Sequence, residues 1–228
     1  VISDVKEISF SLLPEFNDIR PFLWWNYHES KKPKFRIDVK YTARFNLKTS
    51  GDALRFDDFF RPDDKRKRFR KIVKENPFFC LINSCEDFEK LVRLYDETLE
   101  RSGGKASAAD LHTLERLLVL TRNHNAEIHS YILEAYLKDS GAFVGFQLLL
   151  GSKNTIYAIA QSSTSIGRAC SANVFLTHES FCFAKNKGFE IFDFNGANSP
   201  NRADDKHSYG AVAQPYFDLR LTTNVREK

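Results

Sequence analysis

The centre of the chain alternates apolar and polar residues with the period of β-strands. Three such runs follow one another at residues 127–137, 142–150 and 154–161, and only the short links KDSG and GSKN separate them. Links of this length are typical of antiparallel hairpins. The pattern therefore predicts a three-stranded antiparallel meander.

Four other stretches place their apolar residues three and four positions apart, which is the spacing of one helix face. They are residues 62–76, 86–101, 108–121 and 172–187. Ser84 and Ser107 each precede an aspartate by three positions, which predicts a capping box at the start of the second and third helix.

Further strands are predicted on either side of the meander, at residues 35–47, 78–82, 189–196 and 214–221. The resulting order is helix, strand, helices, meander, helix and strand. This order indicates an α+β (mixed α/β) fold with a mainly antiparallel central sheet flanked by helices. Residues 1–30, which contain both tryptophans, are predicted to form a packed but irregular segment.

Composition narrows the class of protein only slightly. The 228 residues include 34 basic and 30 acidic side chains, and this mild excess is weak support for nucleic-acid binding. No apolar run approaches the roughly 18 residues of a membrane span, and no secretory signal pattern opens the chain. The four cysteines form no CxxC pair, so we expect a reduced, cytoplasmic setting and no metal centre.

Seven basic residues surround the apolar stripe of the helix at 62–76. A solvated helix face is one interpretation, and a surface that contacts phosphate groups is the other. Arg66 and Arg70 represent this surface as candidate substrate-binding residues.

Residues 154–210 read as strand, loop, helix, strand and a long final loop. The first loop contains Gly167, Arg168 and Ala169, and the helix that follows begins near Ser171 and Ala172. Free N–H groups at a helix N-terminus bind anions, so these five residues form a candidate phosphate site. The alternative is an ordinary glycine-containing turn between a strand and a helix.

Several stretches resemble the FemAB-like branch of the GNAT acyltransferase superfamily. KRKRFRKIVKEN and FEKLVRLYDETLERSGG are similar to two successive helices of that family, and the strand–loop–helix–strand unit has the GNAT order. The family's ending, D-F-x-G followed by F-K-x-x-F-G, is matched by Asp193, Phe194, Gly196, Lys206, Tyr209 and Gly210. Two features depart from the pattern. Asp205 replaces the aromatic residue before the lysine, and the phosphate loop lacks its usual basic or amide residue in front.

The resemblance implies direct attack of an amine on a thioester or ester carbonyl. It assigns the donor phosphates to Gly167, Arg168, Ala169, Ser171 and Ala172, with acyl-CoA (acetyl-CoA) as co-substrate. It also implies that Lys206 stabilises negative charge at the reaction centre. Asp205 could instead neutralise this lysine.

The general base stays open among Asp193, Glu134 and Tyr209, with His207 as a further option. Asp193 lies at a strand end, and Glu134 is flanked by apolar residues that could raise its pKa. Asp193 could equally hold the final loop by hydrogen bonds. Asn195 and Asn198 are candidate substrate contacts in that loop.

We therefore expect an N-acyltransferase whose acceptor is an amino sugar, a sugar nucleotide or another cell-envelope precursor. One alternative uses aminoacyl-tRNA and a peptidoglycan precursor, and it is less favoured because the two central helices are too short for a long helical hairpin. Another alternative is an inactive domain that binds an anionic glycan or nucleic acid. Residues 61–228 are expected to form the acyltransferase domain, and residues 1–60 a remnant or truncated portion of a second GNAT-like half.

Overall fold

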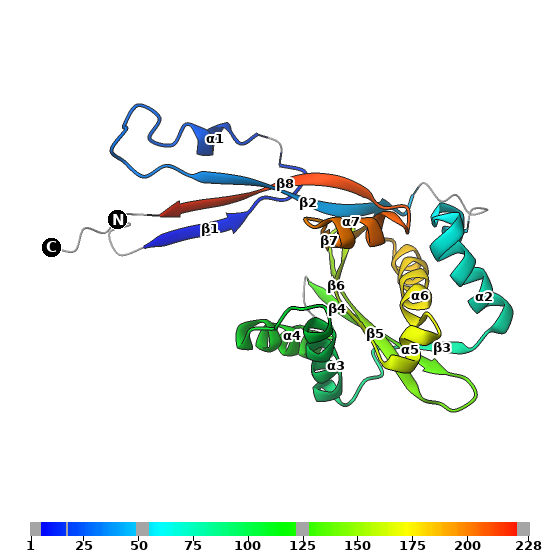
Figure 1. Ribbon diagram of the computed structural model, residues 1–228. Helices are drawn as coiled ribbons and strands as arrows, with labels where there is room; N and C mark the ends of the chain where they lie inside the picture. Colours follow the sequence, from blue (N-terminus) through cyan, green and yellow to red (C-terminus); the bar gives the residue numbers. More distant parts are fainter. Residues whose placement is uncertain (1–5, 17, 49–54, 122–127, 223–228) are drawn as a thin grey trace.

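A computed structural model describes residues 6–16, 18–48, 55–121 and 128–222 and contains one eight-stranded sheet (Figure 1). The strand order is β1-β8-β2-β7-β6-β5-β4-β3. Every neighbouring pair is antiparallel except β6 and β7, which are parallel. The strands are β1 (Glu7–Ser11), β2 (Arg36–Asn46), β3 (Phe78–Ile82), β4 (His129–Leu137), β5 (Phe143–Ser152), β6 (Thr155–Ser163), β7 (Ile191–Gly196) and β8 (Val212–Thr222). The predicted α+β class and the antiparallel meander are confirmed.

Helices cover the β3–β7 part of the sheet on both faces (Figure 1). The helical elements are α1 (Arg20–Leu23), η1 (Phe56–Phe59), η2 (Pro62–Arg66), α2 (Lys67–Glu75), α3 (Phe88–Arg101), α4 (Ala108–Leu120), α5 (Ser165–Ala169), α6 (Ala172–Asn186) and α7 (Pro200–His207). Helix α6 lies on one face and is flanked by α2, whereas α3 and α4 lie on the other face.

The core beneath α6 is mainly aromatic. Phe181 of α6 is fully buried and stacks on Phe45 of β2 with ring centroids 4.7 Å apart. Phe192 of β7 packs edge-on against Phe181, with ring centroids 4.8 Å apart. This cluster fixes α6 against β2 and β7, the strands that lead to the final loop.

The core beneath α3 and α4 is mainly aliphatic. Leu91 and Leu118 are fully buried against Phe146 and Leu148 of β5. This helix pair is therefore a layer of the sheet fold and not a projecting hairpin.

Local signals predicted one of the two capping boxes correctly. Ser107 and Asp110 form the expected reciprocal box at the start of α4. The box predicted at Ser84 is wrong, because Asp87 is the N-cap of α3 and accepts a hydrogen bond from the Lys90 N–H at 3.1 Å. Ser84 instead donates to Glu134 of β4 at 2.9 Å.

One end of the sheet, here called the N-terminal arm, extends beyond these helices (Figure 1). It consists of β1, α1, the segment joining α1 to β2, and the parts of β2 and β8 that pair with each other at Arg36–Tyr41 and Pro215–Arg220. The tryptophans were predicted to be packed, but Trp24 and Trp25 are 61% and 46% exposed. The arm shares the continuous sheet with the rest of the chain, and its origin in a second GNAT-like half stays a prediction.

Candidate active site

The two parallel strands β6 and β7 pair at only three positions and then separate. Thr155, Ile156 and Tyr157 lie opposite Ile191, Phe192 and Asp193. Beyond them β6 pairs with β5 alone, and β7 continues beside β2 as far as Gly196. The strand ends therefore enclose an open wedge in the middle of the sheet.

A β-bulge marks the start of this wedge. Leu149 of β5 lies opposite Ala158, whereas Leu148 lies opposite Ala160, so Ile159 is the extra residue on β6. A bulge interrupts the ladder and turns backbone groups out of the regular pairing, and bulges are frequent beside active sites. A cavity of about 190 Å³ adjoins the bulge on the α3–α4 face and is lined by Tyr95, Asp110 and Ile159 among others.

The final loop closes one side of the wedge through Asn195 and Lys206. Asn195 has a positive φ of 60° and donates from Nδ2 to the Ala158 carbonyl at 2.6 Å. The Lys206 ammonium donates to the carbonyls of Asn195, at 2.9 Å, and of Gly196. Burial lowers the Lys206 pKa to about 8, and the nearby positive charge of Arg202 adds to this effect.

Asp193 is one of the most completely engaged carboxylates of the site. It is 2% exposed, and it accepts from Arg44 Nε at 2.7 Å, from the Thr42 hydroxyl and from the Asn195 N–H at 2.8 Å. This arrangement matches the alternative in which Asp193 holds the final loop. Its assignment as base stays a prediction.

Glu134 lies on β4, which is two strands away from β6 in the sheet. Its carboxylate accepts from Ser84 and, at 3.1 Å, from the Tyr136 hydroxyl. The negative charge of Glu134 and burial together raise the Tyr136 pKa to about 12, with burial the larger cause. Strand spacings near 4.8 Å place Glu134 roughly 10 Å from β6, so it does not join the wedge residues.

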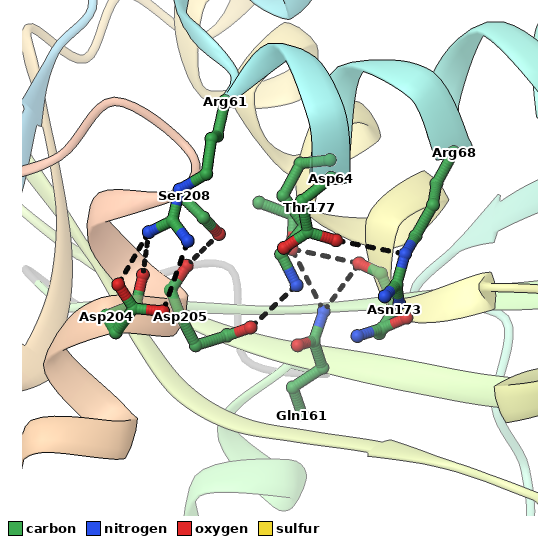
Figure 2. A network of polar contacts seen from close by, with 10 residues as sticks. Arg61, Asp64, Arg68, Gln161, Asn173, Thr177, Asp204, Asp205 and Ser208 are labelled. Carbon is green, nitrogen blue, oxygen red and sulfur yellow. Dashed lines mark hydrogen bonds and ion pairs between the residues drawn. The ribbon is translucent and has the colours of Figure 1, made fainter.

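Helix α7 carries Lys206 and is anchored to η2 by two ion pairs (Figure 2). Arg61 contacts Asp204 at 2.6 Å, and Lys65 contacts Asp205 at 2.6 Å. The carboxylate of Asp205, which replaces the family's aromatic residue, forms its ion pair with Lys65 and not with Lys206. Its negative charge still acts on Lys206, whose pKa it raises slightly against the larger effect of burial. The segment 197–211, read from sequence as a loop, contains this helix.

Lys65 is the residue of the basic run that is most deeply placed. It is only 4% exposed, and its ammonium lies 4.9 Å from the centre of the Tyr209 ring. Tyr209 is 2% exposed, and burial raises the pKa of its hydroxyl. A neutral, enclosed phenol of this kind is poorly suited to accept a proton.

The end of β6 is tied to the start of α6 through Gln161 (Figure 2). Its amide nitrogen donates to the Asn173 carbonyl at 3.1 Å and to the Thr177 hydroxyl at 3.2 Å. The N-terminus of α6 is therefore fixed beside the open end of the wedge. In Figure 2, Asp64 and Arg68, which pair at 3.0 Å, come from the η2–α2 segment to the same region.

The candidate phosphate site differs in form from the expected loop. Residues 165–169 are helical, with the Thr164 hydroxyl accepting from the Gly167 N–H at 3.1 Å. A Cβ at Gly167 would lie 2.1 Å from the Val144 carbonyl oxygen, so this glycine permits close packing on β5. Arg168 and Ala169 are exposed, and the Arg168 side chain donates to the Ser163 carbonyl at 2.6 Å.

The helix end that could bind an anion belongs to Ser171 and Ala172. Ser171 has φ 64° and reverses the chain between α5 and α6. Val174 and Phe175 make the first backbone bonds of α6, both to Ser171. The N–H groups of Ala172 and Asn173 precede these bonds and are the first-turn donors of the helix.

The other candidate substrate residues have structural contacts. Arg66 donates to the carbonyls of Asp57, at 2.8 Å, and Asp58, and Asn198 accepts from the Tyr41 N–H at 2.7 Å. Arg70 is exposed on α2. A role of these residues in binding the substrate stays a prediction.

Sequence reasoning missed Lys65, Gln161 and Thr177. Lys65 precedes Phe69 by four residues and Ile72 by seven, so helical spacing already placed it on the buried stripe. Because the side chain is charged, we nevertheless expected it at the surface. Gln161 and Thr177 gave no comparable signal, because their partners are brought together only by the fold.

Two features are absent from the described residues. No group of three or more histidine, cysteine, aspartate or glutamate side chains is arranged to hold a metal ion within that part of the chain. Among the helices of the same part, none has the length and apolar character needed to cross a membrane.

Comparison with solved structures gives matches of low sequence identity. FemX aligns with a TM-score of 0.63 and 11% identity over 78% of this chain and 61% of FemX. A conserved protein of unknown function from Bacteroides thetaiotaomicron has a TM-score of 0.62 at 10% identity, over 90% of this chain and 67% of that protein. L-PGS from Bacillus licheniformis has a TM-score of 0.50 at 14% identity, over 85% and 63%. These likenesses concern the fold, and the chain spans about three fifths of the length of FemX.

No curated protein matches the chain in sequence. A protein family does match: the acetyltransferase (GNAT) domain family covers residues 62–206, which is more than half of the chain. The resemblance to FemAB-like proteins is confirmed at the level of the fold. The chain belongs to the GNAT acetyltransferase family, whose members carry out acyl transfer.

Proposed function

We propose that this protein transfers an acyl group from acyl-CoA to an amine. The observation that carries the proposal is the wedge between β6 and β7, which begins at a bulge and opens beside the N-terminus of α6. Such a wedge can hold an extended thioester arm while the helix end binds its phosphates. Membership of the GNAT family supports this use of the wedge.

The donor phosphates would bind at the N-terminus of α6. The first-turn N–H groups of Ala172 and Asn173 supply hydrogen-bond donors, and the helix dipole favours negative charge there. Arg168 adds a cation at the end of β6, where its side chain bonds Ser163. Gly167 and Ala169 would then shape the chain for this site without binding the phosphates themselves.

Lys206 would stabilise the negative charge that develops on the acyl oxygen. Its ammonium is held on the β7 side of the wedge by two carbonyls of that strand. Because its pKa is about 8, the group is still mostly protonated at neutral pH and becomes neutral in mild alkali. Electrostatic stabilisation of an oxyanion is commonly a large part of the catalytic effect.

The acceptor amine would approach from the cavity between α3, α4 and the bulge. Asp110 lines this cavity, and its hydrogen bonds with Ser107 lower the pKa of the carboxyl, so a negative charge faces the space. The contacts of the three other candidate bases suit a structural role better than that of a general base; these residues are Asp193, Glu134 and Tyr209. His207 donates from Nδ1 to the Ala211 carbonyl at 2.7 Å, which leaves Nε2 with a free lone pair in the neutral ring.

Ligand-dependent thermal unfolding is the direct test. Acetyl-CoA or CoA at 100 times its dissociation constant should stabilise the protein by roughly 2.7 kcal/mol. An absence of any shift with both ligands would contradict the proposal. The motifs that resemble the FemAB-like branch make aminoacyl-tRNA the second candidate donor, so the same assay with a charged tRNA distinguishes the two. The packing of α3 and α4 onto the sheet favours CoA.

A transfer assay with a panel of amino sugars and sugar nucleotides would then identify the acceptor. Lys206→Met should lower kcat at least tenfold and leave CoA binding unchanged. His207→Gln should lower kcat and leave CoA binding unchanged, if Nε2 of this ring accepts the proton of the amine. A protein that binds CoA but transfers to no amine would support an inactive GNAT-like domain instead.

A further inference from the structure

Arg44 of β2 joins two carboxylates that come from distant parts of the chain. Its Nε donates to Asp193 of β7 at 2.7 Å, and its Nη1 donates to Glu15 in the segment between β1 and α1. The Arg44 side chain is only 8% exposed, and that of Asp193 only 3%. A charge pair buried this deeply is stable only when its geometry is good and each partner makes further hydrogen bonds. The guanidinium therefore holds the Asp193 carboxylate in one orientation.

The second oxygen of Asp193 bonds the final loop. It accepts from the Thr42 hydroxyl and, at 2.8 Å, from the backbone N–H of Asn195. Asn195 has a φ of 60°, a conformation that residues other than glycine seldom adopt. The bond from its N–H to Asp193 stabilises this conformation. The orientation of the Asn195 peptide groups therefore depends on the Asp193 carboxylate.

Asn195 in turn sets the position of the Lys206 ammonium. Its carbonyl accepts from Lys206 Nζ at 2.9 Å, and the next carbonyl, that of Gly196, accepts from the same group. Its side chain donates to the Ala158 carbonyl of β6 at 2.6 Å, which fixes it from the other side of the wedge. A continuous series of hydrogen bonds thus leads from Arg44 to Lys206.

We propose that Arg44 is a positioning residue that holds Lys206 at the reaction centre. Without the guanidinium, the Asp193 carboxylate would be buried with no cation bonded to it, and it would turn toward water or take up a proton. The Asn195 peptide would then lose its fixed acceptor, and the Lys206 ammonium its defined place. A displacement of about 1 Å is enough to slow catalysis considerably. The effect on catalysis rests on the acyl-transfer function proposed above, whereas the effect on Lys206 itself does not.

Acetyl transfer by variants of β2 tests the positioning. Arg44→Gln should lower kcat roughly tenfold and leave CoA affinity unchanged, because the phosphates would bind at the N-terminus of α6 and not on β2. Arg44→Lys keeps a cation beside Asp193 without the fork of the guanidinium, so it should recover part of the loss. Arg36→Gln is the matched control, since Arg36 lies on the same strand and pairs with Asp38 at an exposed position. It should leave kcat and CoA affinity unchanged.

A double-mutant cycle separates positioning from a general loss of structure. In a Lys206→Met background, Arg44→Gln should have little further effect on kcat, because the group that Arg44 positions is already absent. A general loss of structure would instead lower kcat by the same factor in both backgrounds. If Arg44→Gln fails to fold, Arg44→Lys, which keeps the buried charge, takes its place in the cycle.

The pKa of Lys206 gives a readout that needs no activity. In protein with isotope-labelled lysine, NMR titration of the signal that Lys206→Met lacks should give a pKa of about 8. Arg44→Gln should raise this pKa, because the released ammonium is better hydrated and the negative charge of Asp193 loses its bonded cation. The other charges that act on Lys206 are those of Arg202 and Asp205, and the variant leaves both in place.

Three results would overturn the proposal. One is an unchanged kcat in Arg44→Gln, and another is an equal loss of kcat in both backgrounds of the cycle. The third is a Lys206 pKa that is the same in Arg44→Gln as in the Arg36→Gln control. A protein that binds CoA but acetylates no amine would contradict the proposed function alone, and the Lys206 pKa would then decide whether Arg44 positions this lysine.

Discussion

The two ends of the same sheet differ in how completely they are covered. Around β4, β5 and β6, helices lie on both faces, and Ile132, Phe146 and Leu149 are fully buried. In the N-terminal arm, which also carries strands β1, β2 and β8, Trp24 and Tyr27 are more than 60% exposed. Backbone pairing is continuous across both regions. Sheet formation therefore does not require full burial, and the stability of the fold must come chiefly from the covered end.

The largest expected difference between the two ends is the response to removing a large aromatic ring. Phe181→Ala removes the central ring of the aromatic core under α6 and should lower the free energy of unfolding by about 3–5 kcal/mol. Trp24→Ala in the arm should change it by about 0.5 kcal/mol or less. Urea unfolding of both variants measures this contrast. Equal losses would show that the arm is as strongly coupled to the core as α6.

In the covered end of the sheet, even one added methyl group should lower the stability of the fold. In Gly167→Ala, the new methyl group would lie 2.1 Å from the Val144 carbonyl oxygen, so α5 must move away from β5 at a cost of about 1–3 kcal/mol. Gly104→Ala is the matched control, because the nearest atom to its methyl group, the Leu99 carbonyl oxygen, lies 3.5 Å away. Urea unfolding that ranks the two variants equally would contradict the packing assigned to Gly167.

Within the covered end, the two ion pairs that anchor α7 should contribute unequally to stability, because one contains a buried cation and the other is exposed. Asp205→Ala leaves the buried ammonium of Lys65 without its partner and should cost about 2 kcal/mol. This is below the usual range for a buried pair, because the Asp205 side chain itself is 54% exposed. Asp204→Ala breaks an exposed pair with Arg61 and should have little effect.

Urea unfolding of the Asp204→Ala and Asp205→Ala variants measures their stability, and CoA binding shows whether the site is still intact. If only Asp204→Ala lost stability, the Arg61 pair and not the Lys65 pair would be the stabilising one. Asp205→Asn, which keeps a hydrogen-bond acceptor for Lys65, should recover part of the loss.

The regular elements were predictable because each carries its own periodic signal. The meander, the four longer helices and the final strand follow from spacing alone. Strand β1 and the short helices α1, η1, α5 and α7 were not predicted. Helix α5 has five residues, fewer than two turns, so its apolar spacing gives no signal. Helix α7 begins at Ser199 and Pro200, a recognisable helix start, but its residues were read through a family motif as a loop.

The site was less predictable than the fold, because its contacts join distant residues. Lys65 and Asp205 are 140 positions apart, and Arg44 and Asp193 are 149 apart. No local pattern links such pairs, and the motif that identified Lys206 did not indicate what surrounds it. The resemblance located the important segments, and the packing decided which of their charges face one another.

The last expected effect concerns Lys206 and depends on pH. Burial lowers its pKa to about 8 from the ordinary 10.5, so between these values the unfolded chain holds a proton that the folded chain has released. The free energy of unfolding must then rise with pH across this interval, since stability increases wherever the unfolded state binds more protons. Relative to Lys206→Met, the unmodified protein should gain stability from pH 8 to pH 10.5 and gain none below pH 7. Lys206→Arg, which stays charged throughout, should show no such gain. If urea unfolding gives the same difference between the unmodified protein and Lys206→Met at pH 7 and pH 10.5, Lys206 is as well hydrated as the lysines of the N-terminal arm.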